Sequence, residues 1–173
     1  MNYWEGYVIN KDSVKLEGLI KNENGMSLND AKKKFINFIA KKNGEKYKLY
    51  PKDILGYGIK FQNQYVSSGK LFLQVIKLGK QINLFKHVKD KSFMSAPDAG
   101  GMVGSYNQLI KTTYYFQKKG TKEFKKVEKH KFKKRFMEYF ADCIHLQSKI
   151  INGELGHHDA EKIAAIYNGC PLQ

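Results

Sequence analysis

A dense group of cationic side chains is the feature of this sequence with the clearest chemical meaning. Residues 111–135 contain eleven lysines or arginines and two glutamates, so this stretch carries a net charge of +9 of the +15 of the whole chain. Such a concentration of like charge predicts a surface that attracts an anionic partner. The side chains to which we assign this role, named here the cationic set, are Lys118, Lys119, Lys122, Lys125, Lys126, Lys133, Lys134 and Arg135.

The kind of cation narrows the choice of partner. Of the 31 basic residues, only Arg135 is an arginine. Arginine makes the bidentate contacts on which sequence-specific DNA recognition depends, whereas lysine acts as a point charge. The composition argues against such recognition and leaves other partners open: an anionic surface, an acidic glycan or a protein. Non-specific nucleic-acid binding, with bases stacked on Tyr114 or Tyr115, and a lysine-rich surface that contacts only solvent also remain open.

The two cysteines, Cys143 and Cys170, could form a disulfide. If the C-terminal helices run antiparallel, a rise of about 1.5 Å per residue brings Cys170 back alongside residues 138–144. That geometry is compatible with a disulfide, which would stabilise the fold. The alternative is two buried thiols that pack as small apolar side chains. The residues alone do not decide between these alternatives.

No spacing typical of an active site or a metal site is found. None of the five histidines lies in HExxH or another metal-binding pattern. His157 and His158 are neighbours at an expected helix start, and Cys143 and His145 would point about 200° apart on a helix. An active site would require Asp142, His145 or His157 to meet a partner from the sheet, and no pattern marks that partner. We therefore predict a protein that is not an enzyme and needs no cofactor.

The elements that position these residues are expected to be strands up to residue 127. Short runs rich in Val, Ile, Tyr and Phe alternate with turn sequences, which predicts hairpins in a sandwich or a partly open barrel. The run at 34–40 would also fit a short helix, and residues 22–30 and 92–107 are expected to be loops. The expected strands span residues 6–10, 14–21, 34–40, 46–50, 54–61, 70–78, 81–85, 109–117 and 123–127.

After residue 127 the apolar residues recur at helical spacing. This period predicts one helix from about Glu128 to Asn152, ended by Gly153, and a second helix over residues 158–167, ended by Asn168-Gly169. The sequence thus predicts a single α+β domain over residues 1–173. Its antiparallel β-rich part covers residues 1–127, and a helical hairpin over 128–173 packs on it.

The compartment is open to two interpretations. No window has the roughly 18 apolar residues that a transmembrane helix requires. The first residues, MNYWEGYVIN, have the pattern of a strand and not of a signal peptide. We therefore expect either a cytoplasmic protein, or a periplasmic or exported protein from which a leader has been removed.

Five segments form a distinctive combination. They are GYVINKDSVKLEGLI at 6–20, YPKDILGYG at 50–58, FLQVIKLGKQINLF at 72–85, and the endings FADC at 140–143 and IYNGC at 166–170. Together they resemble a family of small β-rich exported proteins of Gram-negative bacteria with no assigned function. The resemblance covers most of the chain, implies export to the cell envelope, and so favours a disulfide between the two cysteines. It implies no catalytic residues.

These observations lead to one preferred function and one alternative. We expect a non-enzymatic envelope or extracytoplasmic module that binds an anionic partner through the cationic set. The alternative is a cytoplasmic module that binds nucleic acid without sequence preference.

Overall fold

The computed structural model describes residues 2–22, 35–90, 93–94, 106–107 and 110–171. The strands of its large sheet are β1 (Asn2–Ile9), β2 (Lys15–Asn22), β3 (Ile36–Ala40), β4 (Lys46–Leu49), β5 (Gly56–Ile59), β6 (Gln64–Ser67), β7 (Phe72–Lys77), β8 (Ile82–Asp90), β11 (Ile110–Lys118) and β12 (Lys125–Lys126). A separate ladder pairs β9 (Phe93–Met94) with β10 (Tyr106–Asn107). The helices are α1 (Phe132–Tyr139), α2 (Ile144–Ile151) and α3 (Ala160–Asn168).

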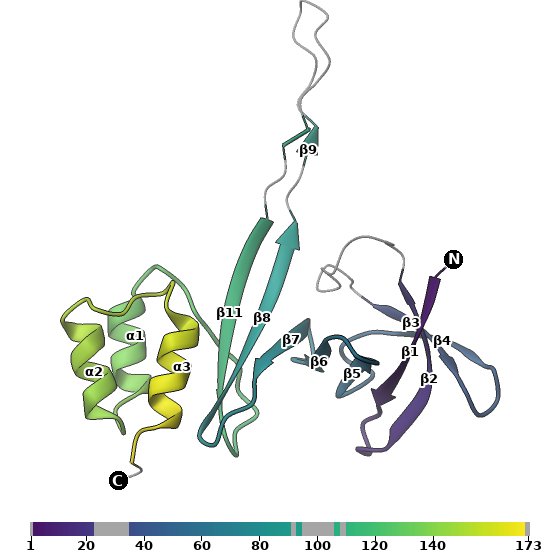
Figure 1. The fold of residues 1–173 in the computed structure, drawn as a ribbon, viewed down its shortest axis with the longest axis horizontal. Coiled ribbons are helices and arrows are strands. Elements are labelled where there is room, and N and C mark those ends of the chain that lie inside the picture. Colours follow the sequence, from purple (N-terminus) through teal and green to yellow (C-terminus); the bar gives the residue numbers. More distant parts are fainter. Residues whose placement is uncertain (1, 23–34, 91–92, 95–105, 108–109, 172–173) are drawn as a thin grey trace, which may run out of the picture.

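The large sheet is antiparallel, and its strand order is β12-β11-β8-β7-β6-β5-β1-β2-β3-β4 (Figure 1). The helices lie at one end of the molecule beside β11 and β8, and β1 to β4 form the other end. This arrangement confirms the expected α+β class, with a β-rich N-terminal part followed by helices. Most expected strands are confirmed, and the run at 34–40 is a strand.

Two stretches of the β part differ from the prediction. β6 was not expected, because only Tyr65 and Val66 of its four residues have strong strand propensity. The loop expected over residues 92–107 contains β9 and β10, and its remaining residues lie outside the described part of the chain. The loop expected over residues 22–30 also lies outside the described residues from residue 23 onwards.

The buried residues of the β part form their own cluster around the stacked rings of Tyr57 and Tyr65, whose centroids are 4.6 Å apart. The strands that contribute to this cluster all belong to the one large sheet, and Ile54, just before β5, adds to it. The members of this N-terminal cluster are Val8, Ile20, Ile36, Phe38, Ile54, Tyr57, Ile59, Tyr65 and Phe72.

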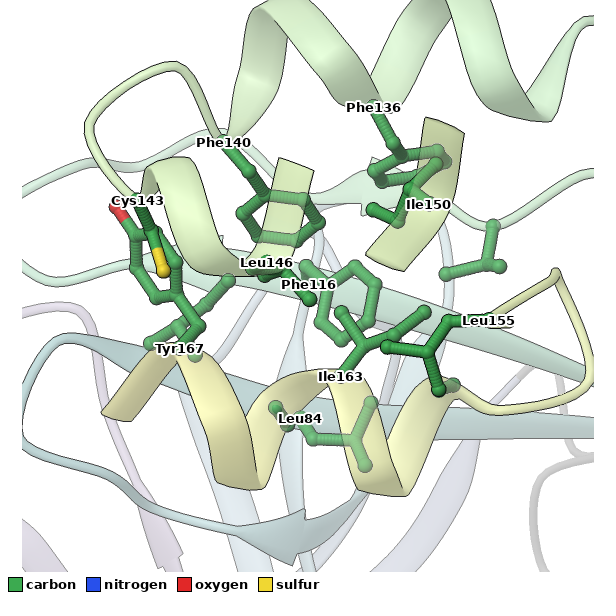
Figure 2. Packing of buried hydrophobic residues seen from close by; sticks show 14 of the residues in the cluster. Leu84, Phe116, Phe136, Phe140, Cys143, Leu146, Ile150, Leu155, Ile163 and Tyr167 are labelled. Carbon is green, nitrogen blue, oxygen red and sulfur yellow. The ribbon is translucent and has the colours of Figure 1, made fainter. Parts of the chain in front are cut away.

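A second cluster joins the helices to the sheet. Phe116 of β11 is fully buried, and its ring packs edge-on against Phe136 and Phe140 at centroid distances of 5.7 and 5.6 Å. Leu84 of β8 and Ile163 of α3 complete the contact (Figure 2). The helices are short, and since each is marginal alone, this packing is what stabilises them.

The prediction of one helix over residues 128–152 is wrong, because the chain leaves helical geometry between α1 and α2. Phe140 and Cys143 flank the break with φ values of −109° and −132°. Asp142, between them, accepts hydrogen bonds from Lys118 and Tyr167. These contacts hold the segment against β11 and α3 and take the place of the missing helical turn. The helical part therefore has three helices and not the two of a hairpin.

Candidate anion-binding site

The cationic set is spread over three elements. Lys118 ends β11, Lys125 and Lys126 form β12, and the three cations from Lys133 to Arg135 lie on α1. Lys119 and Lys122 lie in the turn that joins the two strands. The set is therefore not one continuous row of side chains, and its members have different surroundings.

Half of the cationic set is paired with carboxylates. Glu128 lies between two cations, with Oε1 2.6 Å from Lys126 Nζ and Oε2 2.6 Å from Arg135 Nη1. These two hydrogen bonds lower the pKa of Glu128, and the same carboxylate raises the pKa of Lys126. Lys125 Nζ lies 3.9 Å from Glu123. The positive charges of Lys125, Lys126 and Arg135 are thus partly balanced by carboxylates of the same chain.

Lys118 is the most enclosed member of the set. Its Nζ lies 2.9 Å from Asp142 Oδ2 and 5.2 Å from the ring centroids of both Tyr139 and Tyr167. Burial tends to raise the pKa of Asp142, but the hydrogen bonds from Tyr167 and Lys118 outweigh this and lower it. Burial also raises the pKa of Tyr139 to about 12. Lys118 therefore joins β11 to the helices and is poorly placed to bind a ligand.

The other four members have no carboxylate partner in the part of the chain that the structure describes. Lys119 and Lys122 are exposed in the turn, and Lys133 and Lys134 are exposed on α1. None of the four lines either of the two cavities described below. They add to the long-range positive potential, but the geometry gives them no shared binding position.

Basic side chains do converge on a cavity of about 600 Å³, named here the basic cavity. It lies where the first half of β11, the segment from β12 to α1, and the residues before α3 meet. Its cationic or protonatable lining residues are Lys111, Lys126, Lys129, His157 and His158. The remaining lining residues are Thr112, Thr113, Tyr114, Val127 and Glu128.

Local contacts explain how the chain forms this cavity. The Val127 N–H donates to the Tyr114 carbonyl at 2.9 Å, which holds the segment before α1 against β11. The Tyr114 hydroxyl lies 3.4 Å from Glu161 Oε1 and so links β11 to the first turn of α3. The Gly156 N–H donates to Asp159 Oδ2 at 3.0 Å, in a turn that carries the two histidines. Three segments distant in sequence are thereby fixed around one space.

The electrostatic balance of the basic cavity is positive. Glu128 is the one carboxylate among the described lining residues, and Lys126 and Arg135 already bind both of its oxygens. The His157 and His158 rings are 3.6 Å apart. Burial lowers the pKa of His157, and the nearby charges of His158 and Lys129 lower it further. The charges of Lys111 and Lys129, which have no carboxylate partner in the described ranges, leave the cavity with a positive potential.

Sequence reasoning found only one residue of this cavity in the cationic set, Lys126. Lys111 and Lys129 belong to the same +9 stretch, so the charge composition could have identified them. His157 and His158 precede α3, as expected, but their place beside β11 required the tertiary contact. The nucleic-acid interpretation relied on Tyr114 and Tyr115, which are both half-buried. Each ring therefore offers only part of its surface for a base to stack on.

Of the three residues considered for catalysis, Asp142 contacts a residue of the sheet, Lys118 of β11, and His157 lines a cavity beside β11. In the described residues, no hydrogen bond or ion pair joins Asp142, His145 and His157: Asp142 binds Lys118 and Tyr167, His145 is exposed on α2, and His157 lines the basic cavity. Over the same ranges, no group of three or more His, Cys, Asp or Glu side chains could hold a metal ion. No described helix has the length and apolar character to cross a membrane.

The two cysteines form a disulfide, with their Cα atoms 5.9 Å apart. It links the start of α2 to the residue that follows Gly169 after α3, and Cys143 is buried. Of the two alternatives that the sequence left undecided, a disulfide or two buried thiols, the structure has the disulfide.

Comparison with known proteins gives no assignment. No protein-family model matches the chain, and neither the curated proteins nor the solved structures contain a significant match. The resemblance to exported envelope proteins therefore stays a prediction.

Proposed function

We propose that this protein is a non-enzymatic binding module for an anionic ligand, acting outside the cytoplasm. The observation that carries the proposal is the basic cavity, where five cationic or protonatable side chains surround a space whose described lining has one, already paired, carboxylate. A volume of about 600 Å³ lies in the range of small-molecule sites. The cavity thus has room for one or two phosphate- or carboxylate-bearing groups of a larger ligand.

The lining favours a ligand with both charge and hydroxyl groups. Lys111 and Lys129 are exposed and have no carboxylate partner in the described ranges, so each can bind an anionic oxygen without breaking an existing ion pair. Thr112 and Thr113 add hydroxyls that donate or accept. Acidic glycans of the cell envelope carry both kinds of group.

Two observations support a site outside the cytoplasm. The Cys143–Cys170 disulfide is of the kind that persists in oxidising compartments and is rare in cytoplasmic proteins. The motifs that resemble exported envelope proteins agree with this. Together they favour an envelope ligand over an intracellular nucleic acid.

The test compares affinities at matched ionic strength for an acidic polysaccharide, a single-stranded oligonucleotide and inorganic polyphosphate. The variant Lys111→Glu/Lys129→Glu reverses two charges of the basic cavity. Its matched control, Lys119→Glu/Lys133→Glu, makes the same change in net charge at exposed lysines outside the cavity. We expect the cavity variant to lose tenfold or more in affinity for the polysaccharide, about 1.4 kcal/mol, and the control to lose much less.

Equal losses in both variants would mean that only net charge matters, which would overturn the assignment of the site. Tighter binding of the oligonucleotide than of the other polyanions at the same salt concentration would instead favour the nucleic-acid alternative.

A further inference from the structure

The turn between β5 and β6 presents an aromatic side chain to solvent at a strained position. Phe61 is 96% exposed and has a φ of +60°. The left-handed region suits glycine or asparagine, and a bulky side chain there is unfavourable. Since Phe61 is almost fully exposed, burial does not compensate for this strain. A strained, solvent-facing aromatic residue is a feature typical of a binding surface.

Two more aromatic residues flank this turn. The Lys60 N–H donates to the Glu5 carbonyl at 2.8 Å, which places the turn against the first half of β1. There Tyr3 and Trp4 are 38% and 39% exposed. Along β1, Tyr3 points to the same face as Glu5, and Trp4 points to the opposite face. Tyr3 and Phe61 thus form an exposed aromatic corner, with Trp4 beside it on the other face.

Lys60 connects this corner to a second cavity. Its Nζ lies 5.4 Å from the Phe61 ring centroid and 2.6 Å from Glu5 Oε2. Both Lys60 and Glu5 line a cavity of about 650 Å³, named here the amphipathic cavity, on β1, β2 and the end of β3. The aromatic corner and this cavity are therefore parts of one surface.

The lining of the amphipathic cavity combines apolar and cationic groups. Tyr7, Leu19 and Ile39 supply apolar surface, and Lys15 Nζ lies 4.4 Å above the Tyr7 ring. Lys41 also lines the cavity, as does Glu17, while the charge of Glu5 is balanced by Lys60. Apolar surface edged by lysines suits a partner that is itself both apolar and anionic.

We propose that the aromatic corner and the amphipathic cavity together dock on a membrane surface that contains anionic lipid. Phe61, which protrudes from a turn, would enter the interface between headgroups and acyl chains. Tyr3 would lie at headgroup level, where tyrosine concentrates in membrane proteins. Lys15 and Lys41 would contact anionic headgroups, and the net charge of +15 would favour the approach.

The shape of the surface favours a membrane over other occupants. A sugar stacks on an open aromatic face, whereas Phe61 protrudes at the tip of a turn and can insert into a soft interface. This surface shares no residue with the basic cavity, so the inference goes beyond the proposed function and does not depend on it.

Trp4, the single tryptophan of the chain, adjoins Tyr3 and can report on this part of the sheet. The full-length protein is mixed with phosphatidylcholine vesicles, with and without phosphatidylglycerol, and co-sedimentation and tryptophan emission are recorded. We expect co-sedimentation with the vesicles that contain phosphatidylglycerol, with a change in the emission of Trp4 because it lies beside the corner.

Phe61→Gly tests the inserting residue without a change in charge. Glycine relieves the left-handed strain, so this variant should melt at the same or a higher temperature than the wild type. Its vesicle affinity should fall by roughly tenfold or more. The control is Ile144→Ala, which removes a 62% exposed side chain from α2 and should leave vesicle binding unchanged.

Three results would overturn the proposal: no binding to either kind of vesicle, wild-type binding by Phe61→Gly, or full competition by soluble glycerol phosphate. If Lys111→Glu/Lys129→Glu abolishes vesicle binding and Phe61→Gly does not, the basic cavity is responsible. That result would contradict the proposed membrane-docking surface and would support the proposed anion site in the basic cavity.

Discussion

The side-chain amide of Asn168 hydrogen bonds to both backbone polar groups of Ile82. Its Nδ2 donates to the Ile82 carbonyl at 3.0 Å, and its Oδ1 accepts from the Ile82 N–H at 3.0 Å. Oδ1 also accepts from the Gln81 N–H at 2.8 Å, and Nδ2 donates to the Ala164 carbonyl at 2.8 Å. The last residue of α3 thus satisfies the backbone at the start of β8 and fixes the helix to the sheet.

Asn168→Ala should destabilise the fold by about 2–3 kcal/mol, because it leaves partly buried backbone groups without partners. Urea unfolding of the variant and the wild type measures this. Asn152→Ala is the control, since Asn152 is exposed at the end of α2 and its side chain contacts only Glu154 at 3.5 Å in the described residues. A cost for Asn168→Ala no greater than that of the control would contradict the structural role of the amide.

Gly79→Ala should act through the same amide, because a Cβ at residue 79 would overlap the Asn168 side chain. We expect a loss of about 1–3 kcal/mol. The effects of Gly79→Ala and Asn168→Ala should not add, since the smaller residue at 168 makes room for the new methyl group. A double-mutant cycle measures the coupling, and strict additivity would show that the two positions are independent.

Asp142→Asn should lower the melting temperature at neutral pH and have little effect in acid. The folded state lowers the pKa of Asp142, so the ionised carboxylate stabilises the protein above its unfolded pKa of about 4, and this contribution disappears as the pH falls through the folded value. Thermal melts of both proteins across this pH range provide the measurement. Glu138→Gln, at an exposed position on α1, is the control. A difference that does not change with pH would show that the charge is unimportant.

Cys143→Ala should cost about 2–4 kcal/mol in oxidising buffer, through loss of the disulfide. Under reductant the wild type loses the same constraint, so the difference between the two proteins should disappear. Alkylation followed by intact mass should add no label to the wild type without reductant and two labels with it. An equal cost for the substitution under reductant would indicate lost packing of a buried thiol.

Anion binding in the basic cavity should strengthen as the pH falls from about 7 to 5, where histidines take up protons. Because the pKa of His157 is lowered in the free protein, a bound anion would raise it and binding would be accompanied by proton uptake. His157→Asn/His158→Asn should remove this pH dependence, whereas His145→Asn, at an exposed position on α2, should retain it. Calorimetry in two buffers of different ionisation enthalpy measures the protons taken up.

The sequence predicted the elements whose signals are local. Alternating apolar residues and turn residues gave most strands, and the run from Phe132 to Phe140 gave the first helix. The break before Cys143 depends on Lys118 and Tyr167, which are distant in sequence and bind Asp142 only in the folded chain. An aspartate such as Asp142 just before a helix is a recognised signal of a helix start. The apolar residues at helical spacing continue across it, and so the sequence predicted one unbroken helix.

The candidate site was predicted only in part, for the same reason. Charge composition identified the stretch around Lys126, and the cationic set drawn from it includes residues whose charge Glu128 and Asp142 already balance. The basic cavity arises because β11 lies beside the residues before α3. Residues as distant in sequence as Lys111 and His157 line one cavity, and local periodicity cannot predict this.

The presence of two buried clusters in one continuous sheet has a consequence for partial unfolding. β7 belongs to both halves, since Phe72 is buried in the N-terminal cluster and Ile76 packs against the helical one. The disulfide cross-links only the helical half. Local unfolding of the N-terminal half would thus expose the unpaired edge of β7 while the helical half stays folded. An unpaired strand edge can pair with strands of other molecules. The edge of β7 is therefore the edge that such partial unfolding would expose, beside the half of the molecule that the disulfide cross-links.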